Sequence, residues 1–145
     1  MSHSSLLLSI NAESSSVKIT LFALLLQQDG ALLHNHHVLD IYIPFPLVNA
    51  YISGLLNLSP TLKYSRGSRN ISASKIPDEI SSHIDAVGCI LSTILADTGL
   101  KILTDKESIT HVYHRIVHDR NYLAPHVIDQ ETYQKIDRLT DLAPL

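Results

Sequence analysis

Short apolar runs separated by turn-forming residues open the chain. Residues 6–10, Leu-Leu-Leu-Ser-Ile, meet a turn-forming asparagine, which favours a short buried strand over a helix. Residues 13–16 predict a turn, and residues 17–26 predict a second strand. In that strand Val17, Ile19, Leu21 and Leu25 are expected to share one face, and Lys18 and Thr20 to begin the other.

A third strand is expected to follow a tight hairpin. Asp-Gly at positions 29–30 provides the positive φ angles that such a turn requires. The strand is predicted within residues 31–43 and is expected to end at Pro44 and Pro46. The chain therefore opens as a three-stranded antiparallel meander.

Polar residues then replace the apolar pattern until a helix begins. Residues 53–75 are rich in Ser, Gly, Asn and Arg and are predicted to be mostly loop. Pro-Asp-Glu at 77–79 predicts a helix start, and Gly99 occupies the expected C-terminal cap. Between them, apolar residues recur at steps of three and four and predict one buried stripe. The stripe consists of Ile80, Ile84, Val87, Leu91 and Ile94.

The last third of the chain predicts a strand at residues 109–117 and a helix capped by Asp129. Tyr133, Ile136 and Leu139 are expected to form the buried side of this helix, and Pro144 to stop it. The order is three strands, loop, helix, strand, helix. It predicts an α/β fold of the ribonuclease-H-like kind, with helices on an open sheet, in one domain over residues 1–145.

Composition excludes several classes of function. The chain has 145 residues, 45% hydrophobic and 17% charged, with a formal net charge of −3, which is typical of a globular domain without non-specific affinity for nucleic acid or anionic membranes. The longest apolar run, residues 21–26, is far shorter than the roughly 20 residues of a membrane-spanning helix. A secretory signal requires basic residues before its apolar stretch, and this chain has none there. We expect a cytoplasmic protein with no membrane or nucleic-acid partner.

The first candidate for chemistry is N-A-E-S-S-S-V-K at residues 11–18, between the first two strands. Backbone N–H groups and hydroxyls in such a turn can donate hydrogen bonds to phosphate, while Lys18 supplies positive charge. The side-chain oxygen of Asn11 suits magnesium or its water shell. The ordinary alternative is a serine-rich hairpin turn without a ligand.

The second candidate is the end of the strand at 109–117, because ligands usually lie at strand ends in open sheets. Arg115 can pair with a carboxylate or phosphate through its planar fork, beside His118, Asp119 and Arg120. Zinc at His111, His114 and His118 is a less favoured alternative, because no cysteine or glutamate motif completes that site.

Three other features have ordinary structural explanations. The histidine-rich residues 34–37 are expected to end a hairpin strand near water. The single Cys89 is expected to be a structural thiol. Four basic residues of the predicted loop can form a phosphate patch but are more commonly solvated. They are Lys63, Arg66, Arg69 and Lys75.

Three segments together resemble the acetate kinase family of acyl kinases. Residues 10–18 are similar to that family's N-A-G-S-S-S-[LV]-K signature, and residues 114–118 to its G-H-R-[VI]-V-H-G-G segment. Residues 139–145 are similar to L-x-x-L-A-P-L. The resemblance covers nearly all of this chain and about the first third of a typical member. It implies the N-terminal lobe of the actin, sugar-kinase and heat-shock-protein type of fold.

The resemblance implies phosphoryl transfer from ATP to acetate, giving ADP and acetyl phosphate, with Mg²⁺ and ATP as cofactors and a homodimer in the complete family member. Asn11 matches a magnesium-binding residue, Lys18 a nucleotide-binding lysine, and Arg115 the arginine that contacts the acyl substrate. The signature also assigns nucleotide binding to Ser14, Ser15 and Ser16.

Four glycines of the family motifs are replaced, by Glu13, Tyr113, Asp119 and Arg120. A carboxylate at position 13 repels phosphate: two like charges 4 Å apart cost about 4 kcal/mol at an effective dielectric of 20, which magnesium can partly offset. The family's catalytic aspartate and its adenosine-binding half have no counterpart in these residues. We therefore expect no catalytic residue here and no activity from this segment alone. The alternative function is a non-catalytic binding or interaction module.

Overall fold

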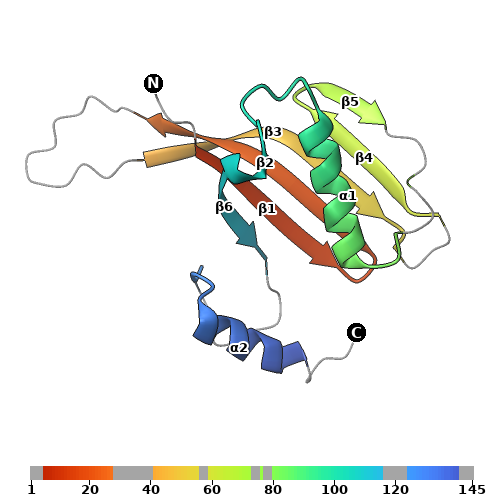
Figure 1. Cartoon of the computed structure of the whole chain (residues 1–145). Coiled ribbons are helices and arrows are strands. Elements are labelled where there is room, and N and C mark those ends of the chain that lie inside the picture. The colour runs from red at the N-terminus through yellow and green to blue at the C-terminus, as the bar shows by residue number, and fades with distance from the viewer. Residues whose placement is uncertain are drawn as a thin grey trace, which may run out of the picture. The chain divides into compact units, whose positions relative to one another are not determined.

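The structure is a computed structural model in which two compact units, Met1–His114 and Arg115–Leu145, are each described by themselves (Figure 1). The described residues are 5–27, 41–55, 59–72, 76, 80–115 and 124–140.

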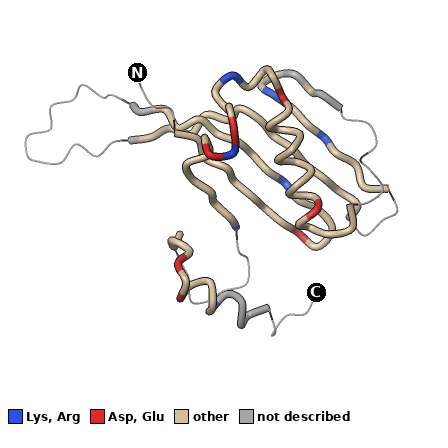
Figure 2. Tube along the Cα trace, in the orientation of Figure 1, with Lys and Arg blue, Asp and Glu red and all other residues tan. Residues whose placement is uncertain are grey.

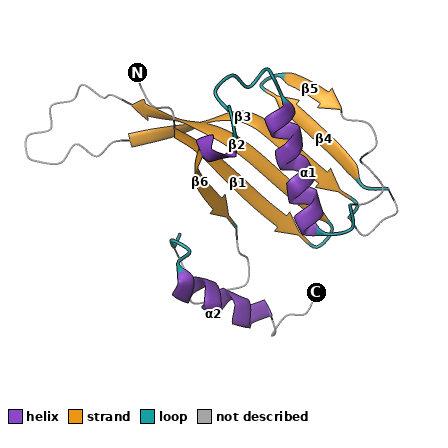
Figure 3. Cartoon of the chain, viewed as in Figure 1, coloured by secondary structure: helices purple, strands orange, loops and turns teal. Residues whose placement is uncertain are grey.

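Six strands of the first unit form one sheet in the order β5-β4-β3-β2-β1-β6. Strands β1 to β5 pair antiparallel in sequence order, whereas β6 lies parallel to β1 at the sheet edge. The strands are β1 (Ser5–Glu13), β2 (Ser16–Gln27), β3 (Ile41–Ser53), β4 (Thr61–Arg66), β5 (Arg69–Ser72) and β6 (Ile109–His114). The mixed α/β class predicted from the sequence is confirmed (Figure 3).

The core lies between one face of this sheet and helix α1 (His83–Ala96), which packs against β2 and β3 (Figure 1). Strand β2 contributes every second side chain from Val17 to Ala23, all buried. The helix contributes Ala86, Ile90 and Ile94. Since full burial of one such aliphatic side chain stabilises a fold by roughly 1.5–3 kcal/mol, this face supplies much of the driving force for folding.

Helix α1 begins later than the sequence predicted, at His83 and not at residues 77–79. Ser82 accepts a hydrogen bond from the Asp85 N–H, and the Asp85 carboxylate accepts one from the Ser82 N–H, so a capping box sets the start. The hydrogen bond from the Ser82 hydroxyl leads the interactions that hold the pKa of Asp85 below its ordinary value. Residues 77–79 lie outside the described part of the chain.

The predicted buried stripe of this helix was also wrong in part. Ile84 is 83% exposed, whereas Ala86 and Ile90 are fully buried. The true buried stripe is therefore displaced around the helix from the predicted one. The helix ends with Asp97 as its cap, and Gly99 follows two residues later. Cys89 is a half-buried free thiol that packs against the core.

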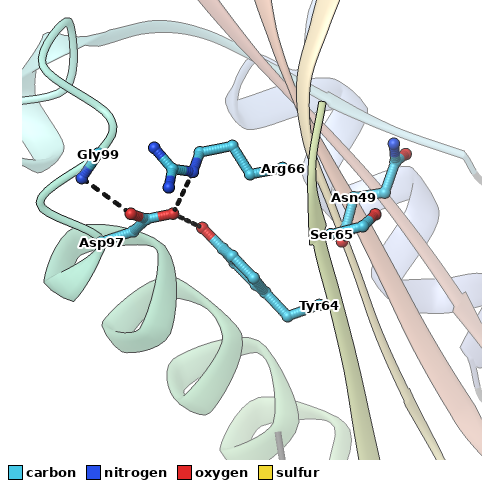
Figure 4. A network of polar contacts seen from close by, with 6 residues as sticks. All are labelled: Asn49, Tyr64, Ser65, Arg66, Asp97 and Gly99. Atoms are coloured by element: carbon cyan, nitrogen blue, oxygen red, sulfur yellow. Dashed lines mark hydrogen bonds and ion pairs between the residues drawn. The ribbon is translucent and has the colours of Figure 1, made fainter. Parts of the chain in front are cut away.

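Asp97 links the end of α1 to strand β4 (Figure 4). Its carboxylate accepts hydrogen bonds from the Tyr64 hydroxyl at 2.8 Å and the Gly99 N–H at 2.9 Å, and it lies 3.1 Å from Nε of Arg66. Burial, and then the hydrogen bond to Asp97, raise the pKa of Tyr64 well above its ordinary value. These contacts join the helix to the sheet outside the apolar core.

The third strand and the loop after it were misplaced by the sequence analysis. Strand β3 begins at Ile41 and contains Pro44 and Pro46, which were expected to end the strand. Strand β4 pairs only with residues 48–53 of β3, so among the described strands the proline-containing part has β2 as its single neighbour, an edge position where proline is tolerated. Residues 28–40 lie outside the described part of the chain.

The stretch 53–75, predicted to be mostly loop, contains β4 and β5. Strand β4 alternates exposed and buried residues, with Leu62 and Tyr64 in the core. Pairing with β3 and β5 stabilises these short polar segments, although their composition is typical of loops.

In the second unit, helix α2 (Gln130–Thr140) begins after Asp129, as predicted. The Asp129 carboxylate accepts a hydrogen bond from the Thr132 N–H at 2.7 Å, which leads the interactions that lower its pKa. Tyr133 was expected to be buried but is 59% exposed, so the predicted buried side of this helix was wrong at that residue. The side chains at 136 and 139 lie outside the described part of the structure. No described helix is long and apolar enough to cross a membrane.

We expect Gly99→Ala to destabilise the protein by about 1 kcal/mol, because a Cβ at this position would overlap the Arg66 guanidinium and displace it from Asp97. In an Arg66→Ala background the same substitution is expected to be neutral or slightly stabilising, as Gly→Ala often is. Urea denaturation of the four proteins measures this coupling. Equal costs in both backgrounds would contradict it.

Candidate functional site

The predicted turn at 13–16 is confirmed and joins β1 to β2 directly. Glu13 pairs with Ser16 and Asn11 pairs with Lys18 across the hairpin. Because side chains alternate along a strand, these four lie on the sheet face opposite to the core. Strand β6 runs parallel to β1, and its last residue, His114, pairs with the residue before Asn11. The carboxyl ends of these two strands therefore lie side by side, where ligands commonly bind.

Two contacts fix the turn to the rest of the first unit. The Leu55 N–H donates a hydrogen bond to the Ser15 carbonyl at 3.1 Å. Nε2 of His83 lies 2.6 Å from the Glu13 carbonyl oxygen, which can only accept, so Nε2 carries the proton of this hydrogen bond. The turn is thus held by the segment after β3 and by the first residue of α1. His83 was not among the residues expected at the site, because the helix was predicted to start earlier than it does.

The Glu13 carboxylate accepts hydrogen bonds from two side chains that the sequence assigned to ligand binding. Nδ2 of Asn11 lies 3.2 Å from Oε1, and Oγ of Ser16 lies 3.3 Å from Oε2. Ser16 is almost completely buried, whereas Glu13 is exposed. The carboxylate therefore takes donors that would otherwise be available to a phosphate.

Lys18 and Ser14 carry the polar side chains of this turn that are exposed and could contact a ligand. Both are exposed, and Lys18 forms no ion pair with any residue in the described part of the chain. Ser15 is half-buried, and its carbonyl is engaged by Leu55. The turn can thus offer a phosphate one ammonium group and one exposed hydroxyl, next to one carboxylate.

The oxygen atoms of Asn11 and Glu13 are of the kind that Mg²⁺ prefers. Across the described residues, no group of three or more His, Cys, Asp or Glu side chains is arranged to hold a metal. Mg²⁺ is commonly held by one or two carboxylates together with the phosphates of a substrate. These residues therefore fit an ion that arrives with a nucleotide better than one held by the protein alone.

Arg115 directly follows β6, is exposed, and belongs to the second unit. His111 and His114 are three residues apart on β6, which places them on opposite faces of the strand and separates two of the three zinc candidates. His118, Asp119, Arg120 and the residues at 34–37 lie outside the described residues.

Two of the four basic residues considered as a phosphate patch, Lys63 and Arg66, lie on opposite faces of the sheet. Lys63 is on the same sheet face as Lys18, whereas Arg66 is on the core face with Asp97. Figure 4 shows this division, with Tyr64 and Arg66 on one side of β4 and Ser65 on the other. Lys75 and the Arg69 side chain lie outside what the structure describes.

Comparison with known proteins gives a consistent result. The model of the acetokinase family matches residues 6–145. A probable acetate kinase of Neurospora crassa is 36% identical over 142 residues, which cover 97% of this chain and 27% of that protein. An acetate kinase of Caldanaerobacter subterraneus is 35% identical over 72 residues, covering 49% of this chain and 18% of that protein.

Solved structures agree with the sequence comparison. The acetate kinase of Porphyromonas gingivalis superimposes with a TM-score of 0.68 at 26% identity, over 97% of this chain and 31% of that one. A propionate kinase of Francisella tularensis gives 0.61 at 22% identity, over 97% of this chain and 30% of that one, and supports the fold alone. These neighbours have the actin-like fold that the sequence resemblance implied. The chain spans less than a third of the length of these relatives.

We expect Ser16→Ala to lower the free energy of unfolding by about 1 kcal/mol, because it removes a buried donor from the Glu13 carboxylate. Ser14→Ala is the matched control: this serine is exposed, and its substitution is expected to change stability by less than about 0.5 kcal/mol. Urea denaturation of both variants measures the difference. Equal effects would show that the Ser16 hydrogen bond contributes nothing to stability.

Proposed function

The chain belongs to the acetokinase family, and from this premise we propose that its β1–β2 turn binds the phosphates of a magnesium–nucleotide complex. The observation that carries the proposal is the arrangement of Lys18 beside Asn11 and Glu13 on one face of one hairpin. Lys18 supplies a positive charge that has no ion-pair partner among the described residues, and the other two supply oxygen ligands for the metal.

For the whole protein we propose phosphoryl transfer from ATP to acetate, giving acetyl phosphate and ADP. Relatives at 33–36% identity carry the name probable acetate kinase, which supports this reaction. In the proposal Asn11 contacts magnesium, Lys18 and the serines at 14–16 contact the nucleotide, and Arg115 contacts the acyl substrate. The cytoplasmic location and the homodimer expected from the sequence are parts of the same proposal.

The proposed task of these residues is to position and neutralise charge. Phosphoryl transfer depends mainly on holding the phosphates in place and on stabilising the charge of the transferred group. Magnesium, when bound, would supply part of that neutralisation. No residue of this chain is assigned to a proton transfer or a covalent step, so we expect no turnover from these 145 residues alone.

Glu13 should make nucleotide binding depend on magnesium. Its carboxylate adds negative charge to the turn, and the donors of Asn11 and Ser16 already point at it. Free ATP therefore meets repulsion, whereas a divalent cation between the carboxylate and the phosphates turns that repulsion into attraction.

The same contacts of Glu13 favour a second candidate function. A turn whose donors are satisfied internally has less need of an anionic ligand, as expected for a non-catalytic binding or interaction module. The two candidates differ in whether the turn binds a nucleotide.

We expect Mg-ATP to raise the thermal stability of the chain, whereas ATP with a chelator gives little shift. A ligand at one hundred times its Kd stabilises the folded state by about 2.7 kcal/mol. Lys18→Ala should abolish the shift. Glu13→Gln keeps the size of the side chain and removes its charge, so ATP without magnesium should bind at least about tenfold better than to the unchanged chain.

Lys101→Ala is the control for non-specific loss of charge, since Lys101 is exposed in the turn after α1 and forms no ion pair with a described residue. Absence of any nucleotide-dependent shift in the chain and in Glu13→Gln would overturn the nucleotide proposal and favour the binding module.

A further inference from the structure

A row of polar side chains crosses four strands on the sheet face opposite to α1. Asn11 of β1 pairs with Lys18 of β2, Lys18 with Tyr51 of β3, and Tyr51 with Lys63 of β4. Directly paired residues point to the same face of a sheet. We call these four residues the lysine row.

The two lysines of this row are close enough to act on one ligand. Neighbouring strands lie about 4.8 Å apart, so Lys18 and Lys63, two strands apart, are separated by about 10 Å at the backbone. This distance is close to the screening length of about 8 Å at physiological salt, and the flexible stems let the ammonium groups approach further. Their fields therefore overlap on the face between them.

Charge on this face is unbalanced. Glu13 is the only acidic residue in any of the six strands, and Figure 2 shows the other acidic segments in helices and loops. Arg66, Lys106 and Lys135 each lie within 4.0 Å of a carboxylate. Neither lysine of the row forms an ion pair with a described residue, and both are exposed.

The neighbouring row is polar as well, and hydrogen bonds hold it in place. Thr20, which is only 9% exposed, donates a hydrogen bond from Oγ1 to Oδ1 of Asn49 at 2.9 Å. The Ser65 hydroxyl donates to the Asn49 carbonyl at 3.4 Å. A sheet face that packs against another layer is normally apolar. This end of the face therefore suits a polar ligand better than a covering helix.

We propose that the lysine row binds the polyphosphate chain of the nucleotide, with Lys63 as a second cationic contact beside Lys18. This inference rests on the proposed function and extends its site from the β1–β2 turn to β4. Two ammonium groups about 10 Å apart suit a chain of linked phosphates better than one isolated phosphate. Tyr51, half-buried between the lysines, offers a hydroxyl to the same chain.

Isothermal titration with inorganic tripolyphosphate and with Mg-ATP, at low and at physiological salt, tests this inference. Lys63→Ala should lower the affinity for both ligands about fivefold, as expected for the loss of one exposed charge contact. It should also make the affinity depend less on salt concentration. Lys63→Arg keeps the charge and should restore most of the affinity. Lys101→Ala is the control and should change neither affinity, and circular dichroism checks that each variant is folded.

The outcomes separate this inference from the function on which it rests. Loss of affinity in Lys18→Ala but not in Lys63→Ala would overturn the lysine row and leave the nucleotide site at the turn. Binding of tripolyphosphate that needs both lysines, without binding of Mg-ATP, would keep the row as a polyphosphate site but overturn both the nucleotide function and the assignment of a nucleotide to the row. An equal loss of affinity in Lys63→Ala and Lys101→Ala would show that Lys63 makes no specific contact and would overturn the lysine row. Absence of all binding would overturn both proposals.

Discussion

Burial of alternate residues along β2 is the constraint on which both the core and the candidate site depend. Val17, Ile19 and Leu21 are fully buried under α1. The period of two then places Lys18 and Thr20 on the opposite face, and a slip of one residue would bury the lysine and expose the core. Because burial of each aliphatic side chain contributes roughly 1.5–3 kcal/mol, the register is strongly specified. The hydrophobic core therefore positions the lysine that we assign to phosphate binding.

The turn carries one negative and one positive side chain. The Glu13 carboxylate accepts hydrogen bonds from two neutral donors, Asn11 and Ser16, whereas Lys18 has no ion-pair partner among the described residues. A neutral donor stabilises a carboxylate without cancelling its charge. The turn therefore presents positive and negative charge side by side. A ligand that carries both, as a metal–phosphate complex does, complements this arrangement better than a bare anion.

Local patterns predicted the parts of the fold that local interactions determine. Strands β1 and β2, the turn between them and the Asp129 cap follow from alternation, turn residues and side-chain capping. Strands β4 and β5 were missed because pairing, and not composition, makes those segments strands. The position of Lys18 on the face opposite to Val17 and Ile19 followed from the alternation along residues 17–26, whereas Asn11 was expected to end the first strand and instead lies within β1. The alignment of Lys63 with Lys18 was not visible in the sequence, since it needs the register of three strands.

In the proposed site, Glu13, which stands where the resembling signature has glycine, would act through its charge and not through backbone strain. Glu13 is the last residue of β1 and pairs with Ser16, so its backbone is extended, a conformation that any residue adopts. The carbonyl oxygen of Glu13 accepts a hydrogen bond from His83 at the start of α1, and the hairpin register is regular up to the turn. A conformational defect would have distorted the register between Asn11 and Lys18, which instead continues to the turn. The hairpin thus keeps its regular register up to the turn, and in the proposed site the carboxylate changes which ligands the turn favours.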